Sequence, residues 1–122
     1  GNSNSNALAV GGTVSPTQQT ELWDGSSWTE VNDLNNGRGE MGASSASSTD
    51  AMVMGGAPNI RHTEIWNGTG WTEVANLANK HDAGTGFGNS TSLALITGNN
   101  GSPRDVTEEW TQAHAIKTID LS

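Results

Sequence analysis

Cysteine and tyrosine are absent from this chain of 122 residues, and phenylalanine occurs only once. Without cysteine the chain can form no disulfide, and it offers neither a thiol nucleophile nor a thiolate metal ligand. The hydrophobic residue types make up only 32% of the chain, which is too little for one thick aliphatic core. The apolar residues are instead ordered along the sequence, so we expect a folded chain built from short elements.

Basic residues are scarce. Five Lys and Arg stand against 13 Asp and Glu, which gives a formal net charge of −8 at pH 7. Binding to a nucleic-acid backbone needs Lys and Arg to replace condensed counterions, and an anionic membrane surface repels an acidic chain. We therefore expect no nucleic-acid partner, no membrane insertion and a self-repelling, solvated surface.

The chain is rich in glycine and tryptophan, and these residues recur in a fixed order. Residues 20–31 (TELWDGSSWTEV) return 43 positions later as residues 63–74 (TEIWNGTGWTEV). Residues 7–12 (ALAVGG) return at an offset of 44 as residues 51–56 (AMVMGG). A weaker third copy consists of LALITG at residues 93–98 and TEEW at residues 107–110. A tandem repeat of about 43 residues therefore organises the chain.

Each repeat predicts four short strands. The apolar run Ala51–Met54 stops at a glycine pair, and the runs Thr63–Trp66 and Trp71–Val74 flank an Asn-Gly turn typical of a hairpin. A further strand is expected ahead of the apolar run, around Gly39–Ser45 and again around Ala83–Phe87. Four short antiparallel strands per unit are typical of a β-propeller blade, so we predict an all-β fold.

The repeat resembles the kelch family. The matching features are the basic residue Arg38, the strand that ends in Gly55-Gly56, and the tryptophans Trp66 and Trp71. Kelch blades usually carry tyrosine at the position of Trp66, so this is a divergent version. The resemblance implies four-stranded, kelch-like propeller blades arranged as a partial ring of about three. The sequence of residues 20–31 also looks like repeats common in tail and appendage proteins of marine bacteriophages.

The domain prediction is a single propeller segment over residues 1–122, with repeats at about 1–37, 38–79 and 80–122. Trp28 and Trp71 open the same strand of successive units, and we expect both to be buried between blades. The residues assigned to the repeat scaffold are Gly11, Gly12, Trp23, Trp28, Gly55, Gly56, Trp66, Trp71 and Trp110.

The number of blades is smaller than a closed ring needs, which is about four to eight. Gly1-Asn2-Ser3 aligns with Gly88-Asn89-Ser90, part-way into a unit. We expect either that these residues are the C-terminal part of a longer chain or that several copies assemble into a ring. The last unit departs from the pattern after Trp110, and its strand-like residues 116–121 are predicted to close a ring or contact a neighbour.

No catalytic, cofactor-binding or metal-binding constellation is predicted. The histidines at 62, 81 and 114 share no ligand spacing and are expected in exposed loops. Asp24, Asp50 and Asp105 lie in turn contexts but form no calcium loop. The glutamates that recur at 21, 64 and 108, and at 30 and 73, are interpreted as strand-face charges paired with Arg38 or Lys80, because an active site needs one asymmetric constellation. Acceptor patterns for N-glycosylation occur at Asn67, Asn89 and Asn100.

These features predict a non-enzymatic structural or binding component of a virion or extracellular appendage, such as a phage tail, fibre or neck decoration. It would serve assembly or attachment to a host surface. Its expected partners are other chains of a symmetric assembly or upstream repeats, with a host-surface glycan as a further candidate, and no cofactor is expected. The alternatives are a lectin-like, carbohydrate-binding propeller and a propeller-based enzyme, since a fold alone decides neither.

Overall fold

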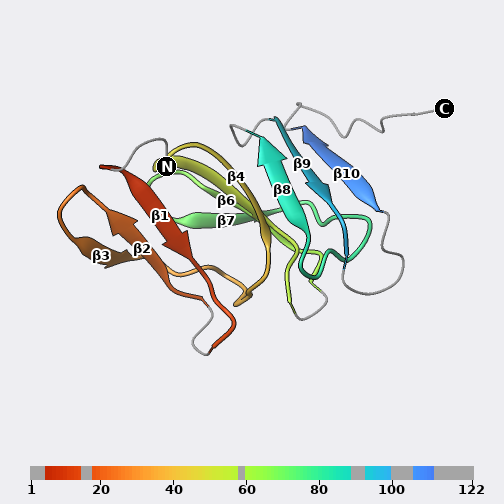
Figure 1. The fold of residues 1–122 in the computed structure, drawn as a ribbon, viewed down its shortest axis with the longest axis horizontal. Helices are drawn as coiled ribbons and strands as arrows, with labels where there is room; N and C mark the ends of the chain where they lie inside the picture. Colours follow the sequence, from red (N-terminus) through yellow and green to blue (C-terminus); the bar gives the residue numbers. More distant parts are fainter. Residues whose placement is uncertain (1–4, 15–17, 58–59, 89–92, 100–105, 112–122) are drawn as a thin grey trace.

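Three antiparallel sheets stand in a row in the computed structural model, which describes residues 5–14, 18–57, 60–88, 93–99 and 106–111 (Figure 1). The first sheet consists of β1 (Ala7–Val10), β2 (Thr20–Trp23) and β3 (Trp28–Val31). The second consists of β4 (Gly42–Ser47), β5 (Asp50–Met54), β6 (Thr63–Trp66) and β7 (Trp71–Val74). The third consists of β8 (Thr85–Gly88), β9 (Leu93–Thr97) and β10 (Thr107–Thr111). The described residues include no helix, membrane-spanning or otherwise, so the all-β prediction is confirmed.

The two predicted hairpins between β2 and β3 and between β6 and β7 are confirmed, and each has a four-residue loop. Gly25 and Gly68 alone take a positive φ in these loops, at 99° and 95°. Asp24 and Asn67 act through their side chains: each Oδ1 accepts the amide hydrogens two and three residues ahead, at 2.8 to 3.0 Å. Such a side-chain-capped turn explains why either Asp or Asn serves at this position.

The first strand of each unit begins later than predicted. The predicted strands started at residues 39 and 83, whereas β4 begins at Gly42 and β8 at Thr85. Glu40 and Ala83 have positive φ values of 50° and 60°, which an extended strand does not allow. The amide of Ala83 donates to the carbonyl of Glu40 at 3.0 Å, so these two corners pack against each other.

Hydrogen bonds also correct the alignment of the third unit by one residue. The amides of Gly11, Gly55 and Gly98 each donate across the sheet, at 2.8 to 2.9 Å, to the residue just before the next strand of the unit. Gly98 therefore corresponds to the first glycine of the pair, whereas the sequence match had aligned it with Gly56. The corresponding φ angles of 68°, 64° and 86° agree.

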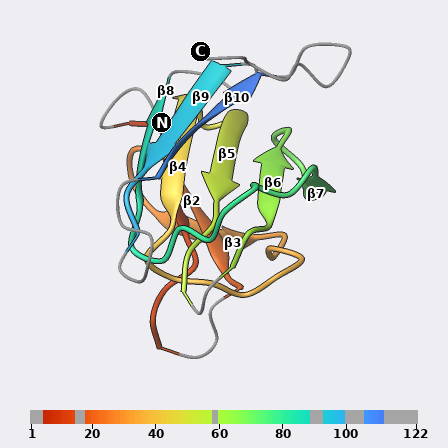
Figure 2. The ribbon, with the colours of Figure 1, turned by 90° about the vertical axis from the view of Figure 1, so that its right-hand side faces the viewer.

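Sheet 2 is buried on both faces because the side chains of β5 alternate. Ala51 and Val53 face sheet 1 and pack with Leu34, Trp66 and Trp71. Met52 and Met54 belong to a second cluster, toward sheet 3, which also contains Leu77, Ala94 and Ile96. Figure 2 shows sheet 3 in front of sheet 2 from that side. Short sheets packed face to face in chain order are the arrangement of propeller blades.

The first strands of sheets 2 and 3 approach closely. A side chain at Gly86 of β8 would place its Cβ 2.3 Å from the backbone nitrogen of Ala43 in β4. A side chain at Gly42 would meet Ile96 at 2.8 Å. The strands β4 and β8 can therefore lie this close together only because small residues occupy their contact.

Candidate functional site

A buried ion pair joins sheet 1 to sheet 2. Glu64 on β6 accepts the backbone amides of Asn35 and Asn36, at 2.7 and 3.2 Å, from the linker between the two sheets. Its Oε2 also lies 2.6 Å from Nη2 of Arg38, and both side chains are fully buried. The carbonyl of Arg38 accepts the amide of Gly12, two residues beyond the end of β1 in sheet 1, at 3.0 Å. Arg38 therefore binds one sheet through its backbone and the next through its side chain.

The same arrangement recurs between sheets 2 and 3. Glu108 on β10 accepts the amides of Ala78 and Asn79 at 2.6 and 3.0 Å. His81 Nε2 lies 2.6 Å from Oε2 of Glu108, and His81 Nδ1 lies 2.8 Å from the carbonyl of Gly98. The backbone carbonyl of His81 accepts the amide of Gly56 at 2.9 Å. We call each such unit of linker amides, cationic or imidazole side chain and strand glutamate a latch.

The latches correct two expectations about basic residues. His81 was expected in an exposed loop, but its side chain is fully buried. Arg38 does pair with a repeated glutamate as predicted, whereas Lys80 is exposed and the corresponding residue in the next unit is His81. The signal was present in the sequence, because an offset of 43 from residue 38 leads to residue 81. A histidine in place of an arginine concealed it.

The guanidinium of Arg38 is satisfied on several sides. Burial lowers its pKa, while the charges of Glu64 and Glu73 oppose that shift. Nη1 donates to the carbonyls of Gly55 and His62 at 3.2 and 2.5 Å. The role of this buried cation is structural, because its N–H groups already donate to acceptors within the protein.

The tryptophan positions are equivalent in sequence but not in burial. Trp71 is 8% exposed, and its Nε1 donates to Oγ1 of Thr20 in sheet 1 at 2.9 Å. Trp28 is 49% exposed, so the prediction that it is buried is wrong. The local geometry is the same, since Trp23 and Trp28 have ring centroids 5.3 Å apart and Trp66 and Trp71 5.4 Å. The difference is that sheet 1 covers Trp71, and no described sheet precedes sheet 1.

Sheet 1 consequently presents an open face. Strand register places Ala9, Glu21 and Glu30 opposite one another, as it places Val53, Glu64 and Glu73 in sheet 2. The residues of the open face are Ala9, Glu21, Trp23, Trp28 and Glu30, of which all but Trp23 are exposed. The opposite face, with Leu8 and Val10, packs against sheet 2.

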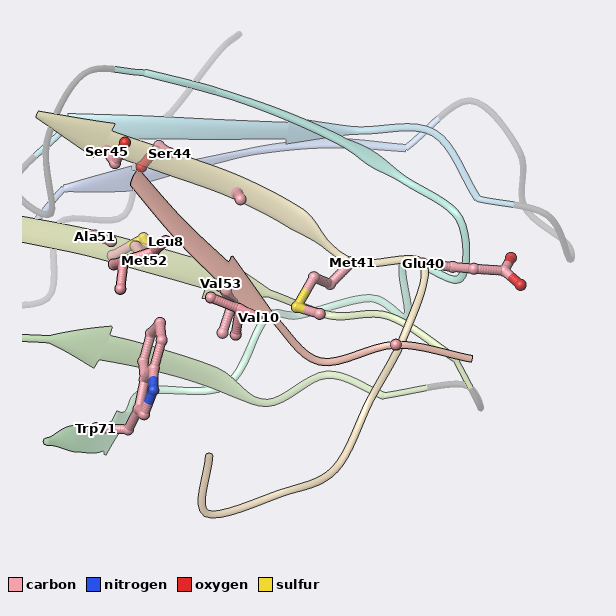
Figure 3. A pocket seen from close by; sticks show the side chains of 12 residues that line it. Leu8, Val10, Glu40, Met41, Ser44, Ser45, Ala51, Met52, Val53 and Trp71 are labelled. Atoms are coloured by element: carbon pink, nitrogen blue, oxygen red, sulfur yellow. The ribbon is translucent and has the colours of Figure 1, made fainter. Parts of the chain in front are cut away.

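A cavity of about 400 Å³ lies beside this sheet, between β1 and β4 (Figure 3). Leu8 and Val10 line it from β1, and Val53 and Trp71 line it from sheet 2. Among the described residues β1 pairs only with β2, and no described strand lies along its other edge. In the third unit the corresponding edge, that of β9, pairs with β8. We call this cavity and edge the open slot.

The described residues contain no group of three or more His, Asp or Glu side chains that could hold a metal ion. Asp24 is engaged in its turn, where the amides of Ser27 and Ser26 lower the pKa of its carboxyl. His114, Asp105, Asn89, Asn100 and the predicted closing strand at 116–121 lie outside the described residues. No protein-family model and no curated protein sequence matches this chain.

Proposed function

We propose that this chain is a non-enzymatic structural module that joins further protein repeats or chains at the open face and open slot of sheet 1. The observation that carries the proposal is the contrast between Trp28, 49% exposed, and Trp71, 8% exposed. The two residues occupy the same position in successive units, and the one inside the array is covered by protein. An exposed indole next to a partly buried one, on a sheet with a strand edge that no described strand covers, is a surface that proteins normally cover.

The repeated carboxylates support a structural role. Glu64 and Glu108 are both committed to latches between sheets, with their oxygens occupied by backbone amides and a basic side chain. A general acid or base needs an oxygen that can reach a substrate. These two glutamates hold the array together instead.

The setting we propose is a virion or extracellular appendage, such as a phage tail, fibre or neck decoration. Its support is the resemblance of residues 20–31 and 63–74 to repeats of marine-phage tail and appendage proteins, together with the kelch-like order of features. There the acidic blades would serve assembly or attachment to a host surface.

One observation favours a second candidate, a carbohydrate-binding surface. Trp28 adjoins Trp23, and Glu30 lies two residues along β3 on the same face, a combination that can stack on a sugar and bind its hydroxyls. Covering by protein remains the better account because the equivalent pair, Trp66 and Trp71, is covered by the neighbouring sheet.

The test compares self-association and glycan binding of the chain with those of Trp28→Ala. Val14→Ala is the control, since Val14 is 81% exposed and lies outside the open face. The proposal expects Trp28→Ala to weaken self-association measured by sedimentation, and Val14→Ala to leave it unchanged. Saturable binding to a glycan array that Trp28→Ala abolishes, with no effect on association, would establish the carbohydrate reading instead.

A further inference from the structure

We infer that the open face of sheet 1 binds the linker and first strand of another repeat of this class, with Glu21 receiving its basic side chain. The inference rests on the proposed function and specifies the chemistry of the partner. It begins from the two latches, in which a linker delivers a buried leucine, two consecutive amides and a basic side chain. These are Leu34, Asn35, Asn36 and Arg38 in one, and Leu77, Ala78, Asn79 and His81 in the other.

Glu21 occupies the glutamate position of a third latch. It lies opposite Ala9 on β1, as Glu64 lies opposite Val53 and Glu108 opposite Ile96. Its side chain is exposed, and it forms no ion pair with any other described residue. The first latch position therefore has its carboxylate while no described linker supplies its donors.

Glu30 extends the match. It lies opposite Glu21, as Glu73 lies opposite Glu64. In the complete latch, Glu73 accepts the side-chain amide of Asn36 at 2.7 Å. Two adjacent carboxylates on an exposed sheet face repel each other, and a cationic partner with amide donors relieves that repulsion.

The open slot accounts for the chain that follows such a linker. Four residues after Arg38 the chain enters β4, and four residues after His81 it enters β8, which pairs with β9. A linker bound at Glu21 therefore leads into a strand beside the free edge of β1. The slot wall formed by Ala43, Ser44 and Ser45 is made of small residues, and the close contact of Gly86 with Ala43 shows how little space separates such strands. The occupant is thus a strand of glycine, alanine and serine with a Leu-x-Asn-x-Arg or similar linker ahead of it.

The repeat itself supplies a direct test. Ser5 corresponds to Thr49 at the offset of 44. A copy of residues 31–48 joined directly ahead of Ser5 therefore leads into β1 in the same way that residues 31–48 lead into β5. The copied Arg38 is then positioned for Glu21, and the copied strand for the open slot. Covalent attachment keeps its effective concentration high.

We expect this extended chain to melt several degrees higher than the original and to exchange the amides of β1 about tenfold more slowly. Glu21→Gln should remove much of the gain in the extended chain and have no effect in the original chain. Arg38→Gln in the copied segment alone should have the same effect, whereas Asp33→Asn, at an exposed carboxylate outside the open face, should have none.

Unchanged melting and exchange on extension would overturn the inference, as would an equal effect of Glu21→Gln with and without the extension. Its failure is distinguishable from failure of the proposed function. If the extension does not dock while the original chain self-associates through Trp28, only the assignment of the partner is wrong. If the extension docks and the original chain never associates, the copied segment identifies the partner but the role in assembly is wrong.

Discussion

At the residue scale, Trp71 and Trp28 carry the same side chain at equivalent positions and differ in what covers them. Trp71→Ala should lower the free energy of unfolding by about 3–5 kcal/mol, because it opens a cavity in the core between sheets 1 and 2. Trp28→Ala should cost less than about 1 kcal/mol, because the residue is half exposed. Urea denaturation of the two variants measures the difference. At a concentration where the chain is monomeric, equal losses would contradict the half-exposed placement of Trp28.

Thr20 and Thr63 form a second matched pair, since both are fully buried at equivalent positions. Oγ1 of Thr20 accepts the indole N–H of Trp71, whereas Oγ1 of Thr63 has no partner among the described residues. Thr20→Val should cost about 1–3 kcal/mol because it leaves a buried N–H unpaired. Thr63→Val should leave stability unchanged or raise it. The same denaturation measurement decides, and equal costs would contradict the hydrogen-bond assignment.

At the scale of elements, the linkers before β4 and β8 hold the sheets together through their latches. His81→Ala should destabilise the chain by about 3 kcal/mol. The substitution leaves the carboxylate of Glu108, which is only 16% exposed, without its side-chain partner. The neighbouring Lys80→Ala is the control and should change stability by less than about 0.5 kcal/mol, since Lys80 is exposed. Thermal melts of the two variants test this. A larger effect at Lys80 would restore the original pairing prediction.

The hairpin between β2 and β3 predicts an acid dependence. The amides of Ser27 and Ser26 lower the pKa of Asp24 from its ordinary value of 3.8. A lowered folded-state pKa contributes stability that is present above the ordinary value and is lost as the pH falls through the lowered one. Asp24→Asn should remove this dependence, since Asn67 makes the same turn without a charge. Melts of both chains should converge toward acidic pH, and a constant difference would contradict the assignment.

The strands show what sequence patterns could predict. β6 and β7 agree with the prediction residue for residue, because apolar alternation and Asn-Gly punctuation both mark their ends. The beginnings of β4 and β8 were missed because positive φ at Glu40 and Ala83 leaves no mark in composition. The burial of His81 was missed because a histidine stands where the repeat has Arg38, so the position did not show as the basic partner of Glu108.

At the scale of the whole molecule, each sheet depends on the next for its burial. Sheet 2 has both faces covered and holds the two core clusters, while sheets 1 and 3 are each covered by sheet 2 on one face. Exposed apolar residues mark both end sheets, with Trp28 on sheet 1 and Phe87 on sheet 3. The exposure of Trp28 could not be predicted from the repeat, because burial between blades is a property of a unit and its neighbour together.

The central claim, that sheet 1 is normally covered by further protein, is tested most directly by the mass and melting of residues 1–122 alone. Sedimentation velocity over a range of concentrations gives the mass, and a thermal melt of the same samples gives the cooperativity. Our account predicts species heavier than the 12.6 kDa chain, with a melting temperature that falls as dilution drives the chain toward the monomer. A monodisperse 12.6 kDa monomer with one sharp cooperative transition would contradict it.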